Sequence, residues 1–178
     1  MSLLAWFLAA VLLFWVIGAY NRLIAMRNKL AQAWARLQSA LDQRGAALQP
    51  LVACLRAPMA AEAGALDAWL AAHAQSSQAA AAMTLRPVNE PHAAAWVAAE
   101  ATLASAAARA LALLDQHSEL ALQEPVTTLA ANWRAGQEQL PFARQAFNDL
   151  AQAYNDAVGQ FPTRWVAHSF TLERAGLI

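Results

Sequence analysis

Apolar positions follow two different patterns at the start of the chain, and both indicate helix. Leu3 to Tyr20 contains no charged residue, so a helix over this stretch is apolar on every side. From Asn21 onward, leucine and tryptophan recur in two heptad rows set three residues apart: Leu23, Leu30, Leu37 and Leu51, and Trp34, Leu41, Leu48 and Leu55. Sustained a/d spacing of this kind predicts a helix over about 21–57 that packs against neighbouring helices.

Three more helices are predicted, over about 60–83, 92–117 and 125–160. The last carries large residues at every seventh position, and mostly small residues three positions further on: Trp133, Leu140, Phe147, Tyr154 and Phe161, followed by Gly136, Ala143, Leu150 and Ala157. Small residues beside a large row allow a partner helix to approach closely. Pro50 and Pro141 are expected to kink the helices that contain them, because proline lacks the backbone N–H of a helical hydrogen bond.

These elements predict an all-α fold in which an N-terminal transmembrane helix continues into an antiparallel up-down-up-down four-helix bundle of long helices. The predicted division is an anchor at 1–20, a bundle at 21–162 and a C-terminal tail at 163–178. Two interpretations of the tail stay open. Its alternating apolar and basic residues suit a membrane-interfacial segment, while a tail packed on the base of the bundle, or frayed, is the alternative.

Two arginines stand on the apolar seam of the first bundle helix, where a guanidinium needs a partner or water. If the last helix runs antiparallel to the first, Arg44 lies opposite Gln137 and Glu138. Arg27 then lies near Asp156 and Asn155. We therefore predict a structural polar seam that pairs Arg44 with Gln137 or Glu138, and Arg27 with Asp156 or Asn155.

The apolar stretch predicts membrane attachment and its orientation. Its 18 residues from Leu3 to Tyr20 give about 27 Å of helix, close to the ~30 Å thickness of the hydrocarbon core. A cleaved signal peptide would carry Lys or Arg before the apolar run, and this chain has none there. Basic residues follow the run before the first acid, Asp42: Arg22, Arg27, Lys29 and Arg36. The positive-inside rule then places the bundle in the cytoplasm.

Composition argues against catalysis and nucleic-acid binding. The net charge is zero and only 13% of residues are charged, so no basic surface for nucleic acid is expected. The four histidines, His73, His92, His117 and His168, lie in separate segments and the chain has one cysteine, Cys54. No metal-ligand spacing, nucleophile elbow or phosphate-binding glycine loop is present in the sequence. We expect no cofactor, no metal and no enzymatic activity.

Two stretches of sequence resemble the LemA family. Residues that carry the N-terminal resemblance include Tyr20, Asn21, Trp34 and Pro50, and those that carry the C-terminal signature include Phe142, Ala143, Arg144, Asn148, Asp149, Tyr154, Asn155, Phe161 and Pro162. The resemblance implies a bacterial membrane-anchored antiparallel helical bundle with no established catalytic activity. The chain departs from the pattern at Gln43 and Gln137, where the family usually has a second arginine and an acid.

The resemblance and the apolar stretch together predict a non-enzymatic scaffold or adaptor of the bacterial cell envelope. It would be held in the inner membrane by lipid contacts of residues 3–20, with protein partners or further copies of itself bound to its sides. A single-span sensor bundle on the outer side of the membrane is the alternative function. Asn148 and Asn155 are seven residues apart and share a helix face, which is either a ladder that recognises a partner or the hydrated flank of an aromatic core row.

Overall fold

The computed structural model describes residues 3–178, and in this range the chain forms helices and no strand, which confirms the all-α prediction. Two long helices open and close the sequence, α1 (Leu3–Ala46) and α6 (Val126–Gly159). Between them lie α3 (Ala63–Leu85) and α4 (Glu90–Gln116). The shorter elements are α2 (Leu48–Leu55), the 3₁₀ turn η1 (Ala60–Glu62), α5 (Ser118–Ala121) and α7 (Thr163–Ser169).

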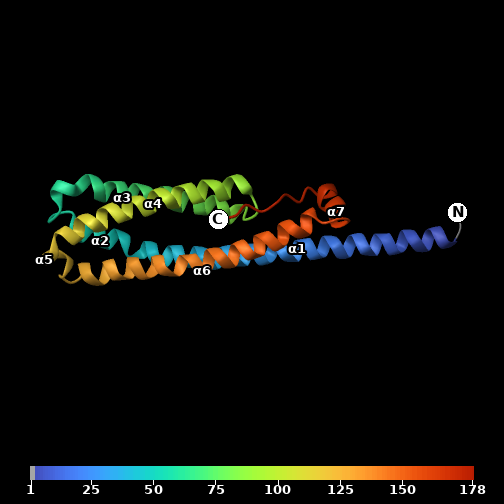
Figure 1. The fold of residues 1–178 in the computed structure, drawn as a ribbon, viewed down its shortest axis with the longest axis horizontal. Coiled ribbons are helices and arrows are strands. Elements are labelled where there is room, and N and C mark those ends of the chain that lie inside the picture. Colours follow the sequence, from blue (N-terminus) through green and yellow to red (C-terminus); the bar gives the residue numbers. More distant parts are fainter. Residues whose placement is uncertain (1–2) are drawn as a thin grey trace.

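The long helices lie side by side as two pairs, α1 with α6 and α3 with α4 (Figure 1). Helix α6 runs opposite to α1, because Trp34 contacts Phe147 while Arg44, further along α1, contacts Gln137. The N-terminal part of α1 projects alone past the end of the other helices (Figure 1). The bundle-forming part of α1 and its apolar extension are therefore one continuous helix.

Two stretches of the described chain are long and apolar enough to cross a membrane, Leu3–Leu55 and Glu90–Gln116. The most apolar 18 residues of the first stretch are not buried inside the protein. In the second, α4 buries Trp96 and Leu103, and Glu100 between them forms an ion pair with Arg44. Helix α4 is therefore a core helix, and α1 is the membrane-anchor candidate.

Proline acts differently at the two positions where a helix kink was predicted. Helix α1 ends at Ala46 and α2 begins at Leu48, four and two residues before Pro50. Pro50 has no N–H to donate to the carbonyl of Ala46, which explains a break at this point. Pro141 lies within α6, and that helix continues through it without interruption.

A layer of tryptophan side chains fills the space between the two helix pairs. Trp34 of α1 meets Trp96 of α4 edge to face with ring centroids 5.3 Å apart, and Trp69 of α3 meets Trp133 of α6 in the same way at 5.0 Å. All four are buried, and they belong to two separate apolar clusters. Edge-to-face geometry is favourable for aromatic rings, so each contact joins one helix pair to the other.

Gly136 sets how closely α6 approaches α1, and it provides a test of their packing. A Cβ added there would lie 2.9 Å from Cβ and 3.0 Å from Cα of Arg44. We expect Gly136→Ala to destabilise the protein, because the backbones must separate, although alanine is better than glycine inside a helix by about 1 kcal/mol. Gly64→Ala is the control, since nothing lies within 4 Å of its added Cβ. Denaturant unfolding in detergent micelles measures both; equal effects would contradict the close approach.

Candidate functional site

A buried ion cluster lies between the two tryptophan contacts and joins all four long helices. Arg44 of α1 donates to both carboxylate oxygens of Glu100 of α4, from Nη1 and Nη2, at 2.8 Å each. Arg44 Nη1 also donates to Oε1 of Gln137 of α6 at 2.9 Å, and the Ser76 hydroxyl of α3 donates to Glu100. Arg44 and Glu100 are only 1% and 4% exposed. Each charge is therefore stabilised by the other rather than by water.

A second arginine and two tryptophan rings complete the cluster. Nη2 of Arg144 lies 3.5 Å from Oε2 of Glu100. The Arg44 guanidinium stands 5.1 Å from the centre of the Trp133 ring, and that of Arg144 stands 4.6 Å from the centre of the Trp96 ring. Cations over aromatic faces are attracted by the ring quadrupole, more strongly where water is excluded. The tryptophan layer therefore stabilises the two positive charges that face one carboxylate.

The electrostatics of the cluster favour the ionised form of the Glu100 carboxylate. Burial alone would raise the pKa of Glu100, but the hydrogen bonds and charge of Arg44, with the Ser76 hydroxyl and the charge of Arg144, lower it overall. A carboxylate with a lowered pKa is a weaker general base than one whose pKa is raised. The geometry thus holds charge in place and fixes how the helices align.

Small cavities flank the cluster on both of its sides. One, of about 190 Å³, is lined on α1 and α3 by residues that include Arg44, His73 and Ser76. The other, of about 230 Å³, is lined on α4 and α6 by residues that include Glu100 and Arg144. His73 has a lowered pKa, first because it is partly buried and second because Arg44 is nearby. It therefore faces the cluster as a neutral imidazole near neutral pH.

Acidification should destabilise the protein in two stages. The pKa of His73 is lowered from 6.5, so below that pH the unfolded chain binds a proton that the folded chain resists. The pKa of Glu100 is lowered from 4.5, and its contribution is lost as the pH falls through its folded-state value. Both act in the same direction, and stability rises with pH. Denaturant midpoints measured at decreasing pH should show a first decline caused by His73 and a second caused by Glu100. The variant His73→Gln should lose the first decline and keep the second.

The predicted polar seam is formed in part. Arg44 bonds Gln137, at the position that the antiparallel register gives, but Glu138 is exposed and is not among the partners of Arg44. The acid that pairs with Arg44 is Glu100, which the sequence analysis missed. Trp96, Glu100 and Leu103 are spaced four and three residues apart on α4, so a carboxylate stood on an apolar helix face and could have been found by that pattern.

The expected pairing of Arg27 is not made by a direct contact in the part of the chain that the structure describes. No hydrogen bond or ion pair in the described chain joins Arg27 to Asp156 or Asn155, and Asp156 is exposed. Burial raises the pKa of the nearby Tyr154, while the charge of Arg27 acts in the opposite direction. Arg27 is only half-buried, so its guanidinium can keep contact with water and needs no acidic partner.

Asn148 and Asn155 of α6 bind the end of the chain itself, a segment here called the C-terminal strap (residues 170–178). The Asn155 amide donates to the carbonyl of Ala175 at 2.9 Å and accepts from its N–H at 2.7 Å. Asn148 makes the same pair of bonds with Ile178, at 2.6 and 2.8 Å. Each asparagine thus satisfies both backbone groups of one strap residue.

The strap lies between α6 and the beginning of α4. The Tyr154 hydroxyl donates to the carbonyl of Glu173 at 3.0 Å. Leu172 and Ala175 are buried, and a Cβ added at Gly176 would lie 2.5 Å from Cβ of Ala93 in α4. Only glycine allows this approach, so the strap is held by side-chain amides on one side and by close backbone packing on the other.

Removing one asparagine amide should release the strap. Asn155→Ala leaves both backbone groups of Ala175 without partners, at a cost of about 1–3 kcal/mol. Hydrogen exchange at the backbone amides of residues 173–178 measures the release as lost protection. Asn132→Ala is the control, because Asn132 is an exposed asparagine of the same helix. Equal protection in the two variants would show that the amide bonds do not hold the strap.

The other residues that carry the family resemblance are spread over several environments. Trp34, Ala143, Arg144 and Tyr154 are buried or half-buried along the core. Tyr20 is half-buried and packs on Phe170, with ring centroids 4.7 Å apart. Pro162 directly precedes α7, and a further group is exposed: Asn21, Pro50, Phe142, Asp149 and Phe161. The structure therefore gathers Trp34 and Arg144 near the ion cluster and Asn148, Tyr154 and Asn155 at the strap.

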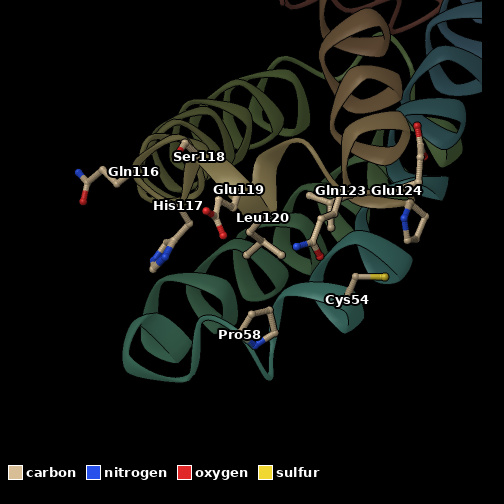
Figure 2. A pocket seen from close by; sticks show the side chains of 11 residues that line it. Cys54, Pro58, Gln116, His117, Ser118, Glu119, Leu120, Gln123 and Glu124 are labelled. Atoms are coloured by element: carbon tan, nitrogen blue, oxygen red, sulfur yellow. The ribbon is translucent and has the colours of Figure 1, made fainter.

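A larger, open pocket of about 710 Å³ lies at the opposite end of the bundle from the apolar extension of α1. Cys54 and His117 both line it but lie on opposite sides (Figure 2). His117 instead faces Glu62, with 3.5 Å between Nε2 and Oε1. Among residues 3–178, no group of three His, Cys, Asp or Glu side chains is arranged to hold a metal ion. The pocket therefore does not pair the Cys54 thiol with the His117 imidazole.

The sequence of the chain matches a known protein family. No curated protein matches the chain. The model of the LemA family matches residues 33–177, which include the ion cluster, the strap asparagines and most of the strap. Since the match covers most of the sequence, the chain belongs to the LemA family.

Proposed function

We propose that the protein is a non-enzymatic scaffold anchored in the inner membrane by α1, with its helices working as one antiparallel up-down-up-down bundle in the cytoplasm. The observation that carries this proposal is the continuity of α1. Its uncharged N-terminal part is exposed and projects from the bundle, while Leu23, Leu30 and Leu37 of the same helix are fully buried against its neighbours. A helix shared by bilayer and bundle would hold the bundle at a fixed position on the membrane.

The polar groups of the bundle support a scaffold more than an enzyme. Arg44 and Glu100 are engaged with each other, and Asn148 and Asn155 are engaged with the strap. These contacts fix the alignment of helices rather than present a reactive group. The exposed face of α4 is rich in alanine, with Ala94, Ala98, Ala101, Ala104 and Ala108 all exposed. Small side chains there would allow a helix of a partner protein to approach closely.

Anchoring and orientation are tested on the full-length protein in cells. A Cys54→Ser chain that carries Leu122→Cys has one thiol on a residue that is 80% exposed in the native protein. For a cytoplasmic bundle, a membrane-impermeant maleimide should label it only after the cells are permeabilised. Labelling of intact cells would place the bundle outside. Leu12→Arg, inside the apolar segment, should release the protein from membranes; a variant that stays membrane-bound would contradict the anchor.

Partner binding is tested by a photoreactive amino acid placed at Ala101 in α4, with Gln139 of α6 as an exposed control position. A scaffold that recruits partners through α4 should give defined crosslinked products from Ala101 and few from Gln139. Products that contain only a second copy of this chain would favour a homo-oligomer. Equal crosslinking from both positions would contradict a specific docking face.

A further inference from the structure

We propose that α7 and the residues beside it form a membrane-contact surface, which rests on the lipid interface around the point where α1 enters the bilayer. The proposal depends on the anchoring proposed above. It assigns the lipid surface as the binding partner of three exposed aromatic side chains in and beside α7: Phe161, Trp165 and Phe170, which are 62%, 62% and 48% exposed.

The position of these side chains carries the proposal. Helix α7 lies at the end of the bundle from which α1 projects alone (Figure 1). Phe170 packs directly on Tyr20, the last residue of the uncharged segment of α1, and Trp165 meets Phe161 edge to face at 5.3 Å. The aromatic surface is therefore continuous with the place where the apolar helix ends, at the depth where aromatic residues favour the membrane interface.

The composition of this end fits a lipid surface better than water. Within α7, Trp165 and Ser169 are four residues apart and lie on one side of the helix, and Phe161, which precedes α7, meets Trp165 there. Arg164 and His168 are exposed beside them, and Glu173 is the only acid in residues 160–178. Exposed aromatic rings among basic side chains are typical of segments that lie in the interface.

The buried face of α7 explains how this surface is held in place. Val166 and Ala167 are buried against the bundle, and the strap that follows is fixed by Asn148 and Asn155. Helix α7 is therefore attached on both sides, at Pro162 and at the strap. Because Val166 and Ala167 occupy the buried face, Trp165 and the flanking Phe161 and Phe170 remain exposed and available to the membrane.

The test uses full-length protein with Cys54→Ser in vesicles of phosphatidylethanolamine and phosphatidylglycerol. A fluorescent label that reports polarity is attached to one cysteine at a time. Ser169→Cys reports α7, and Ser118→Cys is the matched control, because it is an exposed serine at the opposite end of the bundle. Ala10→Cys reports the apolar segment of α1 independently. Lipids with brominated chains quench a label that enters the bilayer.

We expect the labels at 169 and 10 to be quenched and shifted to the blue, and the label at 118 to behave as in water. Replacing Phe161, Trp165 and Phe170 by serine should abolish the quenching at 169 and leave that at 10.

Quenching at 10 with none at 169 would overturn the membrane-contact surface and keep the anchor. Quenching at 169 with none at 10 would keep the surface and overturn the anchor, and quenching at neither would overturn both. A label at 169 that is shielded from aqueous iodide but not quenched by brominated lipid would indicate a protein partner and overturn the proposal.

Discussion

Replacing Glu100 by alanine should destabilise the protein by about 3–5 kcal/mol, because it leaves the buried Arg44 guanidinium without its charged partner. Arg44 is 1% exposed and donates two 2.8 Å hydrogen bonds to Glu100, which also lies 3.5 Å from Arg144. In Glu100→Ala, two arginines would face each other across the core with only Gln137 to accept from Arg44. Denaturant unfolding of the full-length protein in detergent micelles, followed by far-UV circular dichroism, measures the loss.

Two comparisons separate this effect from a general loss of side-chain contacts. Asp67 pairs with Arg56 at 2.7 Å on the surface, where both side chains are more than half exposed, so Asp67→Ala should cost no more than about 1 kcal/mol. Replacing the buried pair together, as Arg44→Met with Glu100→Leu, should restore most of the stability, because both fully buried charges are removed and the Arg144 side chain, which is 32% exposed, can still reach water. If Glu100→Ala costs no more than Asp67→Ala, the cluster is not a buried ion pair.

Replacing Trp133 by alanine should cost a similar amount, about 3–5 kcal/mol, through the cavity that it leaves and the contacts that it removes. Trp133 is 2% exposed, meets Trp69 edge to face at 5.0 Å and lies under the Arg44 guanidinium at 5.1 Å. The matched control is Trp165→Ala, because Trp165 is 62% exposed and its loss should leave the folded bundle almost unchanged. The same unfolding measurement in micelles compares the two; similar losses would contradict the central role of the tryptophan layer.

The two large effects should not add, because Trp133 and Glu100 both act on Arg44. Residues that share a partner usually show a coupling energy of about 0.5–3 kcal/mol in a double-mutant cycle. The Trp133→Ala/Glu100→Ala protein should therefore lose less stability than the sum of the single variants. Full additivity would indicate that the aromatic layer and the ion pair stabilise the bundle independently.

The periodic helices were the part of the structure that could be predicted best. The heptad rows of α1 and α6 predicted two long helices, and the antiparallel register placed Arg44 beside Gln137, where the structure has a 2.9 Å hydrogen bond. These features are encoded locally, because each helix repeats its own buried face along its length. The alanine-rich helices α3 and α4 were less informative, since alanine occurs on both their buried and their exposed faces.

By itself, the sequence determined that the chain is helical, that the N-terminal part of its first helix is apolar on all sides, and that the regions of its first and last long helices resemble the LemA family. Those properties depend on residue spacing within single helices. Only the tertiary structure decided that Glu100, 56 residues from Arg44, is its ionic partner, and that Asn148 and Asn155 bind the strap 20 to 30 residues further on. Such contacts depend on how separate helices stack and where the chain returns, and no periodicity within one helix specifies them.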